Sequence, residues 1–167
     1  MKKLYLVRHA KSSWDNPNLD DHERPLNARG KRDAPYMANL LKEKIELPNL
    51  IISSTAKRAL STAEIFAEIF FIKPDEFIRD KNLYNASSYE LLSIINNLPN
   101  EFQRVMIFAH NPGLTMLTNH IGDNYIDNIP TCGMVEIHFE VNSWKEIKYN
   151  KGNIIKFEYP KKYLKNK

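Results

Sequence analysis

Three short runs of consecutive apolar residues, separated by segments with helical periodicity, most constrain how this 167-residue chain can fold. The runs occupy residues 4–7, 49–53 and 105–109. A strand that is apolar at almost every position is buried on both faces, which is typical of a parallel sheet covered by helices. The pattern therefore predicts an α/β fold with right-handed crossovers.

The segments between these runs predict the remaining elements. Apolar residues recur at helical spacing in segments 34–45, 59–70 and 91–98, and a further helix is expected at 112–121. A short strand is expected at 76–79. Runs 134–141 and 154–159 should pair antiparallel, with Gly152 and Asn153 suited to a turn. We expect a single-domain, three-layer α/β/α fold with a mostly parallel sheet and antiparallel C-terminal strands. The polar loops 17–27 and 125–131 are too short to form a cap domain.

Length and composition describe an ordinary globular domain. With 43% hydrophobic and 26% charged residues, the chain should bury a core without help from disulfides or metals. We place the domain at residues 1–160 and a basic C-terminal tail at 161–167. The net charge of +4 is concentrated in that tail, so we expect no nucleic-acid partner, and we expect a monomer.

Other features exclude several classes of protein. The first apolar run meets Arg8 too soon to form a signal peptide or a membrane span, so we expect a cytoplasmic protein without a membrane partner. Cys132 is the only cysteine, and we assign it to the core. Because His22, His120 and His138 lack metal-ligand spacing, we expect no metal and no cofactor.

Four basic side chains lie where predicted strands end. Arg8 and His9 follow the first strand, and His110 follows residues 105–109. Arg58 begins the helix after the second strand, behind hydroxyl residues 53–55 that could cap that helix. Ligands of parallel sheets bind beyond the carboxyl ends of the strands, so these side chains should converge on one site. Taken singly, each has a structural alternative, such as a pairing of Arg58 with a surface carboxylate like Glu64.

Three motifs and one polar stretch resemble those of a known family. VRHAKSSW, STAKRALSTAE and FAHNPGL resemble the signatures of the histidine phosphatase superfamily, which has the phosphoglycerate-mutase-like fold. The stretch D-x-x-RPL-x-x-x-G at residues 21–30 is similar to that of the SixA-type phosphohistidine phosphatases within the superfamily. Ala10 departs from the glycine that many members carry.

The resemblance implies roles for particular residues. His9 would attack phosphorus and form a phosphohistidine intermediate, while Arg8 and Arg58 would bind the phosphoryl oxygens. His110, protonated in the complex, would be a further donor, and Arg24 would add another phosphate ligand. Polar residues that could orient the site, or else serve turns and caps, are Ser12, Ser13 and Asn111.

An absence favours one substrate class. Mutases and phosphomonoesterases of this superfamily resemble one another in carrying an acid that protonates the leaving oxygen, but residues 83–86 of this chain read LYNA. An imidazole leaving group needs less help than an alkoxide, so a phosphohistidine substrate is favoured, for example on a histidine-phosphotransfer protein. Asp21, Asp80 or Glu90 could still donate a proton. The alternatives are a small-molecule phosphomonoesterase, acting on sugar or nucleotide phosphates, and a non-catalytic phosphate-binding module.

Overall fold

Six strands form one mixed sheet at the centre of the computed structural model, which describes residues 1–165. The order is β3-β2-β4-β1-β5-β6; the first four strands are parallel, and β5 and β6 continue the sheet in antiparallel fashion. All strands expected from the sequence are confirmed. Their bounds are β1 Lys2–Arg8, β2 Leu50–Ser53, β3 Phe77–Arg79, β4 Arg104–Ala109, β5 Met134–Phe139 and β6 Asn153–Glu158.

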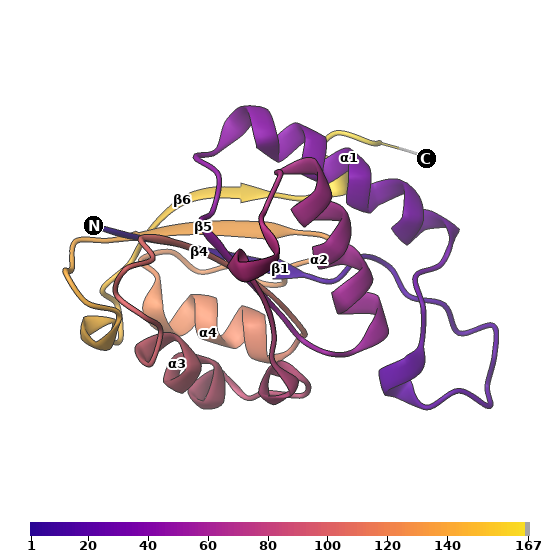
Figure 1. The fold of residues 1–167 in the computed structure, drawn as a ribbon, viewed down its shortest axis with the longest axis horizontal. Helices are drawn as coiled ribbons and strands as arrows, with labels where there is room; N and C mark the ends of the chain where they lie inside the picture. Colours follow the sequence, from indigo (N-terminus) through magenta and orange to yellow (C-terminus); the bar gives the residue numbers. More distant parts are fainter. Residues whose placement is uncertain (166–167) are drawn as a thin grey trace.

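Two pairs of helices cover the two faces of the sheet (Figure 1). Tyr5 and Val7 of β1 pack with α1 and α2, whereas Leu4 and Leu6 pack on the other face with α3 and α4, and all four side chains are fully buried. This alternation explains the continuously apolar run, and the expected three-layer fold is confirmed. The helices are α1 Ala28–Lys44, α2 Lys57–Ile69, α3 Ser88–Asn96 and α4 Gly113–Ile121.

The connection between β5 and β6 is longer than the turn expected at Gly152 and Asn153. It contains a short 3-10 helix, η4 (Trp144–Glu146), and the buried Trp144 donates from Nε1 to the Phe102 carbonyl at 2.8 Å. A Cβ atom at position 152 would lie 2.4 Å from Cγ2 of Ile137. The glycine is therefore needed for a close packing contact rather than for a hairpin turn.

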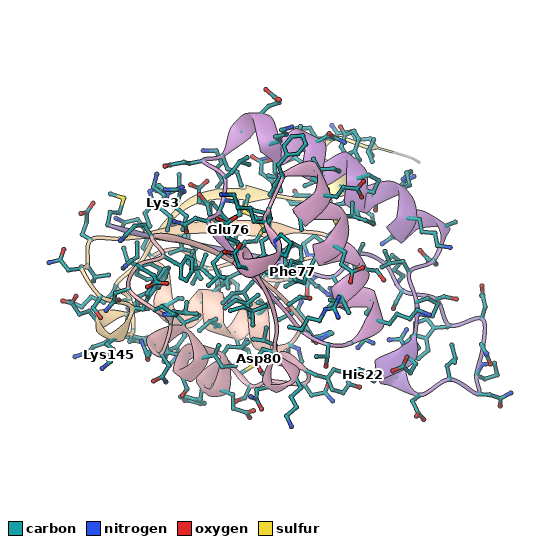
Figure 2. All side chains as sticks on the ribbon, in the orientation of Figure 1. Lys3, His22, Glu76, Phe77, Asp80 and Lys145 are labelled. Carbon is teal, nitrogen blue, oxygen red and sulfur yellow. The ribbon has the colours of Figure 1, made fainter. Side chains whose placement is uncertain are left out.

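The carboxyl ends of β1, β2 and β4 meet at one edge of the sheet. A long loop follows β1, contains the 3-10 helix η1 (Asp21–Glu23), and extends from the body of the protein at the right of Figure 1. Figure 2 places His22 of this loop at the end of the molecule opposite Lys3, which lies near the start of β1. The loop therefore lies beside the edge where Arg8, His9 and His110 lie at strand ends and where Arg58 begins α2.

The last described residues pack beside α1. A 3-10 helix, η5 (Pro160–Lys162), follows β6, and the Tyr163 hydroxyl donates to the Glu158 carboxylate. The Lys44 ammonium lies 5.5 Å from the centre of the Tyr163 ring. Asn166 and Lys167 of the expected basic tail lie outside the described residues. Among residues 1–165, no helix combines the length and apolar character needed to cross a membrane.

Candidate active site

His9 follows β1 directly and is buried, with 7% of its surface exposed. Its Nδ1 lies 2.7 Å from the Ala10 carbonyl oxygen. A carbonyl can only accept, so Nδ1 carries the proton and Nε2 keeps its lone pair. Burial lowers the pKa of His9 to about 3, and the nearby guanidinium groups of Arg58 and Arg8 lower it as well. The ring is therefore neutral, which is the form that can act as a nucleophile.

Two backbone donors fix the turn that carries His9. The Ala10 amide donates to Oγ1 of Thr62 at 3.0 Å, and the Cys132 amide donates to the carbonyls of Arg8 and His9 at 3.1 and 3.0 Å. Thr62 is fully buried on α2. No motif in the sequence pointed to Thr62 as a site residue, although it lies one helical turn after Arg58 and so shares its face of the helix.

His110 directly follows β4 and lies beside His9, with the two ring centres 5.2 Å apart. Its Nε2 lies 2.8 Å from the Ser54 hydroxyl oxygen, and its buried Nδ1 has no hydrogen-bond partner among the described residues. Burial lowers the pKa of His110 to about 3, with a further contribution from His9. The ring is neutral here, so a bound phosphate would have to raise this pKa before His110 could carry the charge expected in the complex.

Ser54 was expected to belong to a group of hydroxyls that cap α2, and this expectation is wrong. The N-cap residue of α2 is Ala56, which has no side-chain cap. The Ser54 hydroxyl instead accepts from the Ala56 amide at 3.2 Å and contacts His110. Ser54, which directly follows β2, therefore contacts His110 of the site.

The two predicted arginine ligands, Arg8 and Arg58, converge on the same site. Nη1 of Arg8 donates to the Ile129 carbonyl at 3.0 Å. Arg58 is 5% exposed and donates to the Asp21 carbonyl at 2.6 Å and to its carboxylate at 3.0 Å. Within the described chain, Nε of each arginine is buried without an acceptor. Unsatisfied buried donors cost free energy, and a bound anion would satisfy them.

Arg24 joins this cluster from the loop after β1. It is 7% exposed, donates from Nη1 to the Ser12 hydroxyl at 2.8 Å, and donates from Nε to the Asp21 carboxylate at 3.1 Å. Its guanidinium also lies 3.5 Å from the centre of the exposed Trp14 ring. Trp14 therefore packs on the side chain of this loop arginine. The structure thus brings Arg24 and Ser12 together at the site.

Ser13 and Asn111 have the turn and cap roles that were the alternatives to site roles. The Ser13 hydroxyl accepts from the Asp15 amide at 3.1 Å. The Asn111 side chain accepts from the Thr115 amide at 3.1 Å and donates to the Ile129 carbonyl at 3.0 Å. Asn111 therefore ties the start of α4 to the segment that also accepts from Arg8.

A carboxylate, Asp21, connects the arginines to Tyr84. Besides its contacts with Arg58 and Arg24, Asp21 accepts from the Tyr84 hydroxyl at 2.6 Å. The hydrogen bond from Tyr84, followed by those from the two arginines, holds the pKa of Asp21 well below its usual range. From the sequence, Asp21 was expected only as one possible proton donor, and no role was expected for Tyr84. The one feature of the sequence that could have indicated this contact is the position of Asp21 at the start of the D-x-x-RPL-x-x-x-G stretch, residues 21–30.

The comparisons with known proteins assign the family. The family model of the histidine phosphatase superfamily (branch 1) matches residues 4–84. An uncharacterized chloroplastic protein of Arabidopsis thaliana is 30% identical over 155 residues, which cover 87% of this chain and 70% of that protein. The chain belongs to the histidine phosphatase superfamily. As a histidine phosphatase, it is an enzyme that uses a histidine nucleophile, as the sequence predicted.

Solved structures place this histidine phosphatase in the SixA-type branch. A structure from Agrobacterium tumefaciens, described as a phosphohistidine phosphatase SixA, is 30% identical with a TM-score of 0.79, and the alignment covers 95% of this chain and 98% of that one. The protein histidine phosphatase SixA complexed with tungstate is similar in fold, with 20% identity, a TM-score of 0.78, and coverage of 95% and 97%. Within residues 1–165 of this histidine phosphatase, no group of three or more histidine, cysteine or acidic side chains is arranged to hold a metal ion.

Proposed function

We propose that this histidine phosphatase removes the phosphoryl group from phosphohistidine on a protein. The observation that carries the proposal is that the Asp21 carboxylate accepts hydrogen bonds from Tyr84, Arg58 and Arg24. An alkoxide leaving group needs a proton from an acid, and a carboxylate held ionised by Tyr84 and Arg58 is a poor donor. An imidazole leaves phosphorus with much less assistance.

His9 is the proposed nucleophile. Its Nε2 lone pair forms a bond to phosphorus as the bond from phosphorus to the substrate imidazole breaks, and that imidazole takes a proton from solvent. Water then attacks the phosphoryl group on His9, releasing inorganic phosphate and a proton and restoring the neutral ring. The neutral state of His9, maintained by burial, supports this role because no separate base is required.

The proposed phosphate ligands are Arg8, Arg58, His110 and, from the neighbouring loop, Arg24. The unpartnered buried Nε donors of Arg8 and Arg58 support this assignment, because each could donate to a phosphoryl oxygen. Fixed donors of this kind stabilise the charge that moves through an in-line transfer. Ser12 holds Arg24 by a hydrogen bond at 2.8 Å and is proposed as a positioning residue.

A small-molecule phosphomonoesterase is the second candidate. A pocket of about 350 Å³ adjoins His110, and its lining includes Asn85, Tyr89 and Met116. Pockets of this size commonly accept small organic groups, which is the observation that favours this candidate.

A side-by-side assay separates the two candidates. Purified protein in excess chelator would be given a phosphohistidine protein, phosphoramidate and a panel of sugar and nucleotide phosphates. The proposal expects higher kcat/KM for the two P–N substrates, with loss of that activity in His9→Ala. A clear preference for sugar phosphates would overturn the substrate assignment, and activity surviving in His9→Ala would overturn the mechanism.

A further inference from the structure

A second pocket, of about 230 Å³, shares Arg8 with the proposed phosphate site but is lined by none of the other proposed phosphate ligands. It is formed by the end of β1, the first two turns of α1, the loop that contains Asn128 and Thr131, and the segment after β6. Five cationic side chains line it: Arg8, Lys11, Arg29, Arg32 and Lys161.

The charge of this pocket is only partly balanced. Asp33 is its one acidic lining residue, and this carboxylate, with 3% of the side chain exposed, contacts Arg32 at 2.7 Å and Arg29 at 3.8 Å. Lys11 and Lys161 form no ion pair with any residue in the described part of the chain. Cationic side chains gathered around a concave surface attract anions, and the attraction is stronger there than on a flat, fully solvated surface.

The size and lining of the pocket suit one particular kind of anion. Its volume admits a single small group rather than a length of polymer backbone. Pro160 and Leu164 add apolar surface beside the cations. An aspartate or glutamate side chain matches both features, because its carboxylate would contact the cations while its methylene groups contact the apolar surface.

We propose that this pocket binds an acidic side chain of the phosphorylated protein substrate while the phosphoryl group lies at His9. The inference rests on the proposed function and specifies its partner as a protein with an acidic residue close to the phosphohistidine. Arg8 lines both sites, so the two groups would bind side by side. Apart from Arg8, the cations of this pocket are not among the proposed phosphate ligands, so its contribution is to substrate binding and therefore to KM rather than to kcat.

The main test compares pocket variants with a distant charge variant. Lys161→Gln and Arg29→Gln each remove one pocket cation. Lys145→Gln removes one cation from η4, which Figure 2 places at the end of the molecule opposite His22. Two of the substrates are phosphohistidine peptides that differ only at the positions around the phosphohistidine. The acidic peptide has Asp and Glu there, and the neutral peptide has Asn and Gln. Phosphoramidate, which has no second anionic group, is the third substrate.

The expected result is specific for the acidic peptide. Each pocket variant should raise its KM about tenfold with kcat unchanged, while Lys145→Gln leaves both constants within twofold of the wild-type values. Hydrolysis of the neutral peptide and of phosphoramidate should be unchanged in all three variants. Equal KM values for the acidic and neutral peptides with wild-type enzyme, or equal effects of Lys161→Gln and Lys145→Gln, would overturn the proposal.

A binding measurement separates failure of the pocket from failure of the phosphatase assignment. Fluorescence anisotropy would measure binding of the unphosphorylated acidic peptide, labelled with a fluorophore. The peptide should bind the wild-type protein and bind Lys161→Gln about tenfold more weakly. Its affinity for the wild-type protein should fall as the salt concentration increases. This readout requires no hydrolysis. A bisphosphorylated small molecule gives the remaining comparison: if pocket variants impair its hydrolysis and leave peptide binding unchanged, the pocket binds a second phosphate and the proposal is wrong.

Discussion

The Ser54 hydroxyl oxygen lies 2.8 Å from Nε2 of His110 and accepts from the Ala56 amide at 3.2 Å. A hydroxyl that accepts from an amide can still donate, and an unprotonated Nε2 is an acceptor within its reach. In that tautomer the proton of His110 lies on Nδ1, the buried atom that lacks a protein partner among the described residues, and Nδ1 can donate to a phosphoryl oxygen.

Ser54→Ala is expected to lower kcat/KM for phosphoramidate about tenfold. The substitution leaves the His110 tautomer unspecified and removes an acceptor from a buried amide. Steady-state kinetics across a pH series would measure the effect. Ser53→Ala is the matched control, because Ser53 is equally buried at the end of the same strand but donates to the Ser54 carbonyl. Equal losses in the two variants would contradict a role through His110.

Asp21→Asn should lower kcat/KM for P–N and P–O substrates alike, by about tenfold. The variant removes the charge that positions Arg58 and Arg24, while the amide can still form hydrogen bonds. Parallel assays with phosphoramidate and a sugar phosphate would measure the change in kcat/KM for each substrate. Asp20→Asn, at the exposed neighbouring carboxylate, should have little effect. Loss confined to the sugar phosphate would identify Asp21 as a proton donor and contradict our substrate argument.

Thr62→Val should destabilise the protein by roughly 1–3 kcal/mol and reduce activity, because it leaves the buried Ala10 amide beside His9 without an acceptor. Urea unfolding and phosphoramidate hydrolysis would measure the two effects. Thr118→Val is a close control: Thr118 is also fully buried and bonds to the carbonyl four residues earlier, but no site amide donates to it. A similar loss of activity in both variants would exclude a specific role for Thr62 in holding the turn.

The sequence predicted the parts of the site that depend on where strands end. Arg8 ends an apolar strand, His9 and His110 directly follow apolar strands, and Arg58 follows another strand by one short loop. The parallel sheet alone therefore brings them to one edge. The layers of the fold were equally predictable, because each strand between two helical layers is apolar on both faces.

The sequence did not predict contacts that depend on the path of a loop. Asp21 and Tyr84 are 63 residues apart, and nothing in either local pattern indicates that they meet. Nothing in the local pattern indicates that Ser54 and His110 meet either, because a serine before a helix also has a plausible capping role. Trp144 likewise packs in a connection expected to be a simple turn, because its buried indole finds an acceptor on a distant segment.

The free energy of unfolding should fall as the pH is lowered from about 6.5 towards 3. His9 and His110 are neutral in the folded protein because burial lowers each pKa to about 3, whereas an unfolded histidine takes up a proton near pH 6.5. The unfolded state therefore binds more protons in this window, and each histidine contributes at most about 1.4 kcal/mol per pH unit to the slope. Urea titrations at several pH values would measure the slope of the unfolding free energy against pH.

His9→Gln should reduce this slope, whereas His120→Gln should preserve it. His120 lies on α4 between the exposed rings of Tyr89 and Tyr149. A wild-type slope retained in His9→Gln would show that His9 is not held neutral by the fold, and its assignment as a ready nucleophile would lose its physical basis.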